Sequence, residues 1–489
     1  MTSVINTNIA SLNAQRNLSS SQTSLQTSIQ RLSSGLRINS AKDDAAGLAI
    51  SSRMTSQING MDQATRNAND GVSMAQTADG ALSSSSDILQ RIRQLAVQSS
   101  NASNTASDRA ALQNEVTQSA SELNRIAQTT QFNGQNLLDG SMGTASFQVG
   151  ANAGQLISMT GANFTTSAYG NNAMTNNAPA AAAADPFTAG TMTIAGSAGS
   201  KDVAVAAGES AKDVAAGINA VSGNTGVTAT AQTNSQLKAT AGSSYTMSLN
   251  SDNSGSAVTV SFTVGNSGGT TPNANDYSQA ISAFNAQSSK TGVTASYDQT
   301  NGGIKLTNAS GNDIKLKAAT GSTADATLGT YTANSTTGGL SAPASAATVD
   351  ATGVVSKGAI EMDSNNSFSV TDGSGYGLGG SSSLKSVGNL DISTFDGAQQ
   401  AIKIADAALA AVNNQRSQYG AIQNRFDSTI SNLGTSQTNL SASRSRITDT
   451  DFASETANMT RSQILQQAGT SMLAQANSLP NGVMSLLRG

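Results

Sequence analysis

Apolar residues recur with a seven-residue period at both ends of the chain, whereas the middle lacks this period. The steps alternate between three and four residues, which is the spacing of a long helix that packs against other helices. Each end therefore needs a helical partner, and we expect the two ends to pack against each other. The C-terminal seam begins at Ile402 and comprises Ala405, Leu409, Val412, Arg416, Tyr419, Gln423, Phe426, Ile430, Leu433, Gln437, Leu440, Arg444 and Ile447, and the N-terminal seam comprises Ile5, Ile9, Leu12, Leu18, Leu25, Ile29, Leu32 and Leu36.

Two further helices are predicted after the N-terminal seam. Residues 35–47 break the period with glycines and a charged cluster, and we interpret them as a connector whose charges are solvated or salt-bridged rather than catalytic. A second helical pattern covers 54–96. A polar stretch that ends at Asp108 predicts the cap of a third helix over 112–126.

The middle of the chain is rich in Gly, Ser, Thr and Asn and contains short strand-like pieces. It also contains a repeat. Asn219 followed by the sequence TGVTA at 225–229 recurs 66 residues later, as Asn285 followed by TGVTA at 291–295. The shared offset predicts two similar units of strand, short helix and strand. Because helix returns from about residue 394, we interpret the middle as an insertion in a helical stem.

The composition excludes most classes of enzyme. The 489 residues contain no Cys and no His, which removes disulfides, thiolate and imidazole metal sites, and the side chain most used for acid-base catalysis. The net charge is -4 and the 26 Lys and Arg form no runs, so we expect no binding of nucleic acid. No motif for a carboxylate or Ser/Lys enzyme occurs. We predict neither catalysis nor a cofactor or metal.

No targeting segment of an ordinary kind is found. The N-terminus lacks the basic and apolar regions of a secretory signal, and no apolar stretch is long enough to span a bilayer. By these rules the protein would be cytosolic, unless it leaves the cell by another route.

The terminal sequences closely resemble those of bacterial flagellins, the subunits of the flagellar filament. The resemblance extends over roughly 1–165 and 390–489, whereas the middle matches only the broad style of variable flagellin insertions. The segments that carry it are INTNIASLN at 5–13, LSSGLRINSAKDDAAG at 32–47, SRSRITDTDFA at 443–453, ILQQAG at 464–469 and AQAN at 474–477.

This resemblance, together with the periodicity, predicts an α+β multidomain fold. A long α-helical coiled-coil stem is formed by both termini, with a β-rich inserted outer region. The domains expected are an inner helical polymerisation domain of 1–42 and 450–489, a helical rod domain with a β-hairpin of 43–170 and 350–449, and a variable β-rich surface insertion of 171–349, in two similar units at about 190–250 and 256–320.

The function implied is that of a structural subunit, which polymerises through its terminal helices into the hollow flagellar filament for swimming motility. By the resemblance, the unfolded chain leaves through the flagellar type III export channel, without a cleaved signal peptide, to an extracellular position. The partners implied are other copies of the chain in a helical homopolymer, an export chaperone on the segment 452–489, the hook-junction and filament-cap proteins, and the host Toll-like flagellin receptor. Neither nucleic acid nor membrane insertion is expected.

Two sets of residues are candidates for contacts. The stretch 90–98 resembles the helix that the receptor recognises, although Gln94 stands where the motif commonly has Glu, and the same residues would also serve rod packing. The receptor candidates are Gln90, Arg91, Leu95, Gln98 and Glu115, and the polymerisation candidates are Ile5, Ile9, Leu12, Leu25, Ile29, Leu32, Leu465, Met472, Leu479, Val483 and Leu486.

Alternatives remain open from the sequence. The heptads alone would favour an intramolecular helical bundle over a polymer interface. A hook-filament junction protein of the same family shares the terminal design. The insertion is compatible with an adhesin, and an enzyme there would require convergent polar residues in a pocket. A membrane-surface role for the C-terminal helix is opposed by its cations, which are limited to Arg461 and Arg488.

Overall fold

The computed structural model describes residues 7–176, 179–183, 187–253, 255–268, 272–319, 325–332, 341, 343 and 346–487, with the side chains of 479–487 excepted. The chain forms two compact units. The first unit combines both ends of the chain, up to residue 75 and from residue 421, with residues 145–159. The second unit consists of 76–144 and 160–420.

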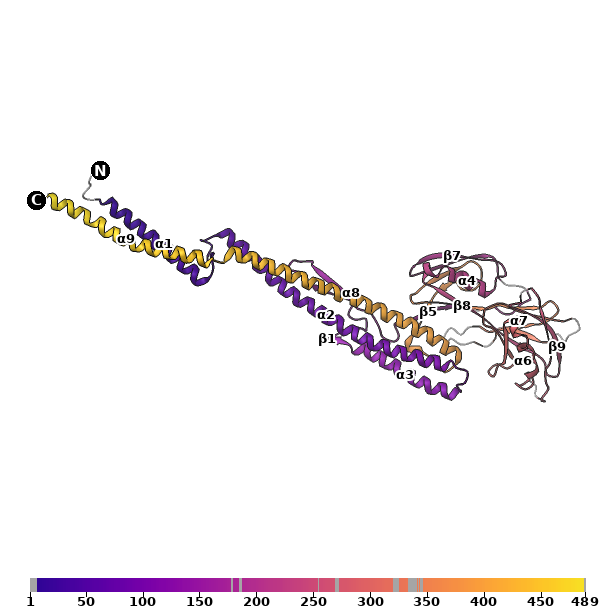
Figure 1. The fold of residues 1–489 in the computed structure, drawn as a ribbon. Coiled ribbons are helices and arrows are strands. Elements are labelled where there is room, and N and C mark those ends of the chain that lie inside the picture. The colour runs from indigo at the N-terminus through magenta and orange to yellow at the C-terminus, as the bar shows by residue number, and fades with distance from the viewer. Residues whose placement is uncertain are drawn as a thin grey trace. The chain divides into compact units, whose positions relative to one another are not determined.

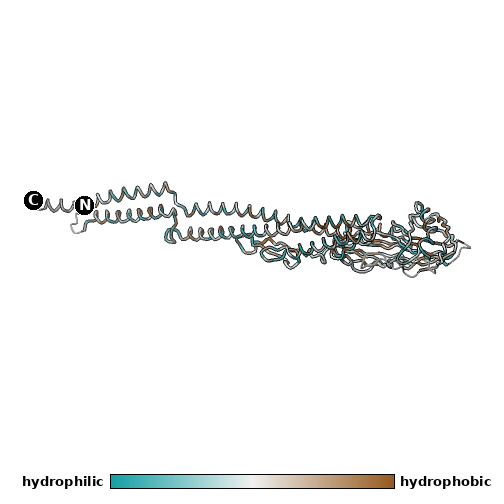
Figure 2. The backbone as a smooth tube through the Cα atoms, turned by 90° about the horizontal axis from the view of Figure 1, so that it is seen from below, coloured by the Kyte–Doolittle hydropathy of each residue, from teal (hydrophilic) through white to brown (hydrophobic). Residues whose placement is uncertain are grey.

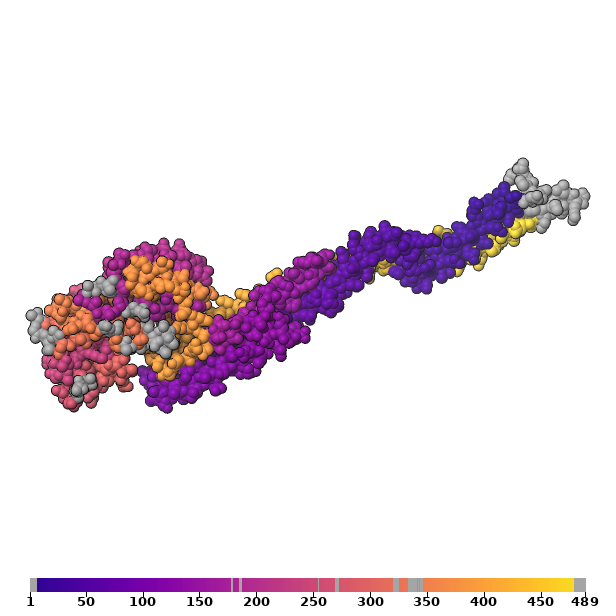
Figure 3. Space-filling model, turned by 180° about the vertical axis from the view of Figure 1, so that it is seen from behind, coloured from indigo at the N-terminus to yellow at the C-terminus, as the bar shows by residue number. Residues whose placement is uncertain are grey.

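The two terminal helices form a pair within the first unit. Helix α1 (Ile9–Ser34) and helix α9 (Phe452–Leu487) lie side by side and antiparallel, with the yellow α9 along the indigo α1 (Figures 1 and 3). Helix α1 ends at Gly35, whose φ of 71° is the left-handed conformation that stops a helix. The prediction that the two ends pack against each other is confirmed.

Two long helices, α2 (Ala45–Ser99) and α8 (Phe395–Thr448), contribute residues to both units. Hydrophobic and hydrophilic stretches alternate along them (Figure 2). Every position of the predicted C-terminal seam is buried or half-buried in α8. The polar seam positions have polar partners on α2: Arg416 Nε donates to Asp79 Oδ1 at 2.9 Å in the second unit, and Gln437 Nε2 donates to Asp62 Oδ1 at 2.6 Å in the first.

Helix α3 (Ala106–Thr129) begins three residues earlier than its predicted cap requires. Thr105, and not Asp108, is the N-cap. The Thr105 hydroxyl accepts from the Asp108 N–H at 3.2 Å, and the Asp108 carboxylate accepts from the Thr105 N–H at 2.9 Å. This reciprocal pair is a capping box, in which the acidic residue occupies the third helical position.

The first unit has a small aromatic core beside its hairpin. Strands β3 (Thr144–Gln148) and β4 (Leu156–Thr160) form a two-stranded sheet. Phe147 of β3 meets the fully buried Phe426 of α8 edge to face, with ring centroids 5.5 Å apart. A shorter hairpin, β1 (Gln131–Phe132) and β2 (Gln135–Asn136), belongs to the second unit, and its turn has Asn133 and Gly134 at positive φ.

The inserted region contains two copies of one motif. In each copy an Asn at the end of a short helix receives a hydrogen bond from, and donates one to, the backbone of the next strand: Asn219 binds Ala229 and Asn285 binds Ala295, all at 2.8 to 2.9 Å. The first copy is β6 (Gly190–Gly196), β7 (Gly199–Val205), α4 (Ala211–Ala220), α5 (Ser222–Thr225) and β8 (Thr228–Lys238). The second copy is β9 (Ser244–Asn250), β10 (Val258–Thr263), α6 (Ser278–Asn285), α7 (Ser288–Thr291) and β11 (Val293–Tyr297), followed by β12 (Ile304–Asn308).

The returning chain completes the sheets of both copies. The sheet orders are β10-β9-β13-β16, β19-β18-β6-β7 and β11-β12-β8-β17-β5-β20. Strand β14 also pairs with β8, and β15 pairs with β14. The elements are β5 (Gly170–Thr175), β13 (Ile314–Ala318), β14 (Thr327–Thr330), β15 (Ala347–Thr348), β16 (Val354–Ser356), β17 (Ala359–Ser364), β18 (Ser369–Asp372), β19 (Gly380–Ser381), β20 (Ser383–Ser386) and the 3-10 helix η1 (Val387–Asn389).

The boundary between helical and β-rich parts therefore lies later than the sequence suggested. Residues 350–390 were expected in the helical rod, but β16 to β20 pair with strands of the inserted region. The reason is burial, because Ile360 and Met362 of β17 are fully enclosed in the core of the first copy. The inserted segment enters and leaves at one place, since β5 and β20 are antiparallel neighbours with Gly170 opposite Ser386.

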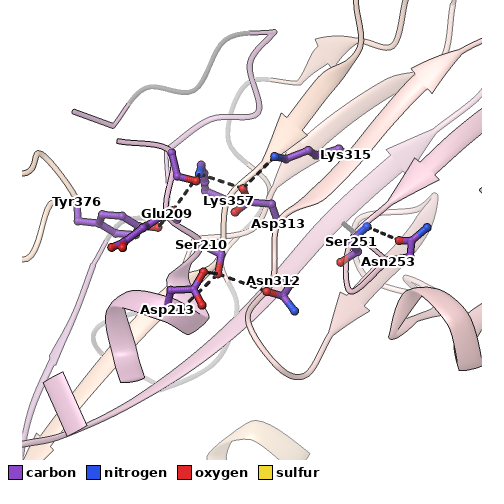
Figure 4. Close-up of polar contacts among 11 residues, drawn as sticks. Glu209, Ser210, Asp213, Ser251, Asn253, Asn312, Asp313, Lys315, Lys357 and Tyr376 are labelled. Carbon is purple, nitrogen blue, oxygen red and sulfur yellow. Dashed lines mark hydrogen bonds and ion pairs between the residues drawn. The ribbon is translucent and has the colours of Figure 1, made fainter. Parts of the chain in front are cut away.

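A buried ion pair joins the two copies. Lys357, whose side chain is 1% exposed, places its Nζ 3.0 Å from Asp313 Oδ2, just before β13, and donates to the Glu209 carbonyl at 3.1 Å (Figure 4). The hydroxyl of Tyr376 donates to the same carbonyl at 2.7 Å. The charge is thus enclosed with several partners, which is the condition for a stable buried cation.

Within the part of the chain that the structure describes, no helix is both long and apolar enough to cross a bilayer.

Candidate assembly surface

Polar contacts fix the register of the terminal helix pair. Asn8 is the N-cap of α1, where its side-chain oxygen accepts from the Ser11 N–H at 3.1 Å, while its amide donates to the Ala476 carbonyl at 2.8 Å. Ser11 Oγ donates to Asn477 Oδ1 at 2.7 Å. One residue thus both starts α1 and attaches it to α9.

Large apolar side chains remain exposed on this pair. Leu25 and Leu32 are half-buried. Other large apolar residues of the pair are between 49% and 66% exposed: Ile9, Leu12 and Ile29 on α1, and Phe452, Ile464, Leu465 and Met472 on α9. Single exposed apolar residues are ordinary, but a series along one helix pair marks an interaction site.

A groove accompanies the exposed residues of α9. It has a volume of about 640 Å³, and among the described residues its lining comes from α9, between Ala453 and Leu465. Its lining includes Thr456, Thr460, Arg461 and Ile464, so the groove is apolar with a cationic border. A surface of this kind can receive the ridge of another helix.

The connector between α1 and α2 is hydrogen-bonded to the short connector between α8 and α9, residues 449–451. Arg37 donates to the Ile447 carbonyl, the Arg37 N–H donates to the Thr448 carbonyl at 2.7 Å, and the Thr450 N–H donates to the Gly35 carbonyl at 3.0 Å. The charged cluster of the first connector makes local bonds: Asp43 Oδ2 accepts from the N–H of Ser40 at 2.8 Å. This bond and that from the Ser40 hydroxyl lower the pKa of Asp43.

The receptor candidates divide into exposed and buried residues. Arg91 and Glu115 form an ion pair across α2 and α3, with Arg91 Nη2 2.7 Å from Glu115 Oε1, and both are exposed, as are Gln90 and Gln98. Leu95 is fully buried. A contact through the Leu95 side chain would require the helices to separate, because the residue lies on the inward face of α2.

Some polymerisation candidates fall outside the described part of the chain. Ile5 precedes it, and the side chains of Leu479, Val483 and Leu486 are not described. Conversely, the sequence reasoning missed Asn8, Phe452 and Ile464. The adjacent Ile464 and Leu465 were a signal that the exposed face of α9 is wider than a heptad seam, and Asn8 three residues before Ser11 was an N-cap signal.

Comparison with known proteins gives matches along the whole chain. The bacterial flagellin N-terminal helical region matches residues 5–142, the bacterial flagellin C-terminal helical region matches 402–487, and the flagellin hook IN motif matches 191–243. B-type flagellin of Pseudomonas aeruginosa is 46% identical over 500 residues, with 100% of both chains covered. Flagellin A of Vibrio anguillarum is 38% identical, again over 100% of both chains. The solved structure of FliC from Burkholderia pseudomallei is 25% identical over 73% of this chain and 99% of that chain, with a TM-score of 0.30.

A helical stem formed by both termini, with unpartnered apolar residues on its terminal pair and a β-rich insertion, defines a self-assembling structural protein. The chain belongs to the bacterial flagellin family. It is a structural subunit that polymerises into the flagellar filament for motility, and it is not an enzyme. The full-length relatives named above are flagellins, which favours this function over the hook-filament junction alternative.

Proposed function

We propose that the exposed face of the α1–α9 pair is the surface through which copies of the chain pack in the filament. The observation that carries the proposal is the series of apolar side chains, including Ile9, Leu12, Leu465 and Met472, that the described part of the chain leaves more than half exposed. Burial of such side chains contributes about 1.5–3 kcal/mol each. A contact that does not close on itself produces an open helical polymer.

The groove on α9 is the proposed seat of a helix from a neighbouring copy. The residues that line it are spaced three and four apart, and Ile464 and Leu465 lie at one end of it. The polar contacts of Asn8 and Ser11 do not occupy the groove, because they are made with Ala476 and Asn477, beyond the residues that line it. Residues 1–42 and 450–489 would then act as the polymerisation domain, 43–169 with 390–449 as the rod, and 170–389 as the outward insertion.

The assembly proposal is tested by seeded polymerisation of Leu465→Ser, followed by electron microscopy and sedimentation. The expected result is a critical concentration raised by about tenfold or more, since each 1.4 kcal/mol is a factor of ten. Leu384→Ser is the matched control, because Leu384 is an exposed leucine of the inserted region at 39% exposure. Equal critical concentrations for the two variants would contradict the proposal.

A chain that lacks 452–489 provides the stronger test. We expect long tubes from the full chain and none from the truncated chain. If the truncated chain formed tubes at the same concentration, polymerisation would have to use other surfaces. If the full chain formed only short capped assemblies, the junction-protein alternative would be favoured.

Before assembly the apolar residues of this face would be exposed to water and prone to aggregation. We propose that an export chaperone binds the segment 452–489 and shields Phe452 and Ile464, which are 66% and 59% exposed. The double variant Phe452→Ser, Ile464→Ser should lose co-purification with the chaperone, while Leu384→Ser keeps it. Hook-junction and filament-cap proteins, which lie at the two ends of a filament, are proposed to bind the same face of the α1–α9 pair.

The host Toll-like flagellin receptor is proposed to contact the exposed residues Gln90, Arg91, Gln98 and Glu115. Arg91 and Glu115 present both charges of one exposed pair. Arg91→Ala is expected to lower the response of receptor-bearing reporter cells to monomeric protein, whereas Arg125→Ala, which removes a similarly exposed pair with Glu122 on α3, leaves the response unchanged. An equal effect of both variants would oppose a receptor contact at Arg91.

A further inference from the structure

Most of the outermost strands of the inserted region are protected against pairing with another chain. Strand β7 carries Lys201 and Asp202, and β20 carries Lys385. Strands β15 and β19 have two residues each. Charged side chains and short strands are the means by which proteins keep the edge of a sheet from pairing with a further strand.

Two further edges are occupied by groups of the same chain. On β11, the side-chain amide of Asn285 accepts from the Ala295 N–H at 2.8 Å and donates to the Ala295 carbonyl at 2.9 Å, as a neighbouring strand would. On β16, the backbone of Val355 exchanges hydrogen bonds of 2.8 and 3.1 Å with that of Ala182. Another strand could pair there only by displacing these groups.

Strand β10 (Val258–Thr263) has none of these protections. It is six residues long, is an outer strand of the sheet β10-β9-β13-β16, and contains neither a charge nor a proline. It pairs with β9 residue by residue, without a bulge. Its counterpart in the first copy of the motif is β7, so the two copies differ in the protection of the same edge.

The backbone groups on the free side of β10 belong to Thr259, Ser261 and Thr263. The Val264 N–H donates to the Ser243 carbonyl at 3.0 Å, on the side of β9. Successive residues of a strand direct their backbone groups to opposite sides, so the other even-numbered residues of β10 also face β9. The three odd-numbered residues face away from it. They are exposed, and no strand among the described residues pairs with them.

We propose that this edge pairs with the β10 edge of a second copy of the chain, antiparallel and centred on Ser261. In this register Ser261 lies opposite Ser261 of the second copy, and Thr259 lies opposite Thr263. Residues that face outward thus meet each other and form the hydrogen-bonded pairs of an antiparallel ladder. The pairing joins the two four-stranded sheets into one continuous sheet.

A second copy suits this edge because the segment is complementary to itself. In the same register Val260 lies opposite Phe262 on the core face, and a pair of a β-branched and an aromatic residue stabilises neighbouring strands. No charged residue occurs between Asp252 and Asp276, so two copies meet there without repulsion. The pairing is separate from the α1–α9 surface, because β10 belongs to the second unit.

Disulfide trapping of the unseeded full-length protein tests this pairing, because the chain has no Cys of its own. In the proposed register the two Ser261 Cα atoms are about 5.5 Å apart, within the range that a disulfide bridges. We expect Ser261→Cys, oxidised with copper phenanthroline in air, to give a linked dimer on a non-reducing gel. Thr259→Cys should give none above background, since its two copies would lie about 14 Å apart along the strands.

The matched control is Ser296→Cys, because Ser296 is an exposed serine of β11, whose edge is occupied by Asn285. Adding Thr263→Pro to Ser261→Cys tests the role of the backbone. Proline removes the outward N–H and keeps the bonds to β9, so the monomer stays folded, which circular dichroism verifies. The initial rate of cross-linking should fall by about tenfold or more, equivalent to roughly 1.4 kcal/mol. Thr263→Ala, which keeps the N–H, should leave the rate unchanged.

Four results would overturn the proposal: equal cross-linking of Ser261→Cys and Ser296→Cys, equal cross-linking of Ser261→Cys and Thr259→Cys, a rate that Thr263→Pro does not lower, or no dimer at all. The last result would leave the edge to an extended segment of another protein. Because the samples are unseeded monomers, failure of this pairing is distinguishable from failure of filament assembly.

Discussion

Arg37 donates two hydrogen bonds to the carbonyl oxygen of Ile447, from Nη2 at 2.7 Å and from Nε at 3.2 Å, across a sequence separation of 410 residues. The contact ties the end of α1 to the end of α8, at the place where the chain enters α2 and α9. Together with the backbone bonds of Thr448 and Thr450, it makes the two connectors one structural element. The end of α1 and the start of α9 are therefore held together at this place.

Loss of this contact should loosen both connectors at once. We expect Arg37→Ala to increase hydrogen exchange at the Thr450 amide by about tenfold, because a hydrogen bond to a charged group contributes roughly 1.5 kcal/mol. Arg446→Ala is the matched control, since Arg446 bonds only locally, to the Ser443 hydroxyl, among the contacts described for it. An unchanged Thr450 rate in Arg37→Ala would show that the backbone bonds suffice.

Two glycines of α2 should respond oppositely to alanine. At Gly71 an added Cβ would lie 2.5 Å from Phe426 Cζ, whereas at Gly80 nothing lies within 4 Å. Gly71→Ala should destabilise by about 1–3 kcal/mol through overpacking, since Phe426 is fixed against Phe147. Gly80→Ala should stabilise by about 0.5–1 kcal/mol, because glycine is unfavourable inside a helix. Denaturant unfolding of the monomers measures both, and effects of the same sign would contradict this account.

The Asp43 carboxylate gives the first connector a pH dependence. Hydrogen bonds from the Ser40 backbone and hydroxyl lower its pKa below the ordinary 3.8. Its stabilising effect is therefore complete above about pH 3.8 and is lost as the pH falls through the lower folded-state value. A carbon-13 carboxyl titration should give Asp43 a midpoint below 3.8, and Ser40→Ala should move that midpoint upward. A midpoint that does not respond to Ser40→Ala would assign the shift to another cause.

Lys403 should be required for the stability of the junction between α8 and β17. Burial, and next the neighbouring Asp363, raise the pKa of Glu361, and Lys403 opposes this effect. Lys403→Met should destabilise by about 1.5–3 kcal/mol at neutral pH, because it removes the cation that is bonded to both of these close carboxylates. The loss should shrink in acid, where a carboxyl with a raised pKa takes up its proton first. It should also shrink in the Glu361→Gln, Asp363→Asn background.

The matched control for this cycle is Lys201→Met, since Lys201 is an exposed lysine of β7. Unfolding free energies at two pH values, measured for the single and combined variants, give the coupling between Lys403 and the carboxylates. Additive effects would mean that the ion pairs contribute nothing to the junction.

The helical stem could be predicted from the local pattern, because the heptad period of apolar residues identifies the face of a helix that packs against another helix. Phe426 and Tyr419 are fully buried where the seam places them. The cap of α3 was missed by three residues, since an acidic residue suits both the N-cap and the third helical position. Leu95 was predicted as a receptor contact from a sequence motif, and such a motif does not show whether a residue lies on the buried or the exposed face of its helix.

Non-local features were beyond sequence reasoning. The strands of residues 350–390 are short, and nothing local indicates that β17 lies between β8 and β5. Lys403 of α8 forms ion pairs with Glu361 and Asp363 of β17, a cluster that exists only once the chain is folded. The repeat was visible because each copy keeps its Asn and its positive-φ glycine, Gly226 or Gly292, in the same local place.

The pairing of β5 with β20 also bears on how such proteins diversify. Gly170 lies opposite Ser386, and the Val387 N–H donates to the Tyr169 carbonyl at 3.1 Å. The two ends of the inserted segment 170–386 therefore lie side by side where they join the stem. Because its ends are fixed together, that segment can lengthen, shorten or be exchanged at a small entropic cost to the stem. Selection can thus alter the inserted region while the helices that assemble into the filament stay the same.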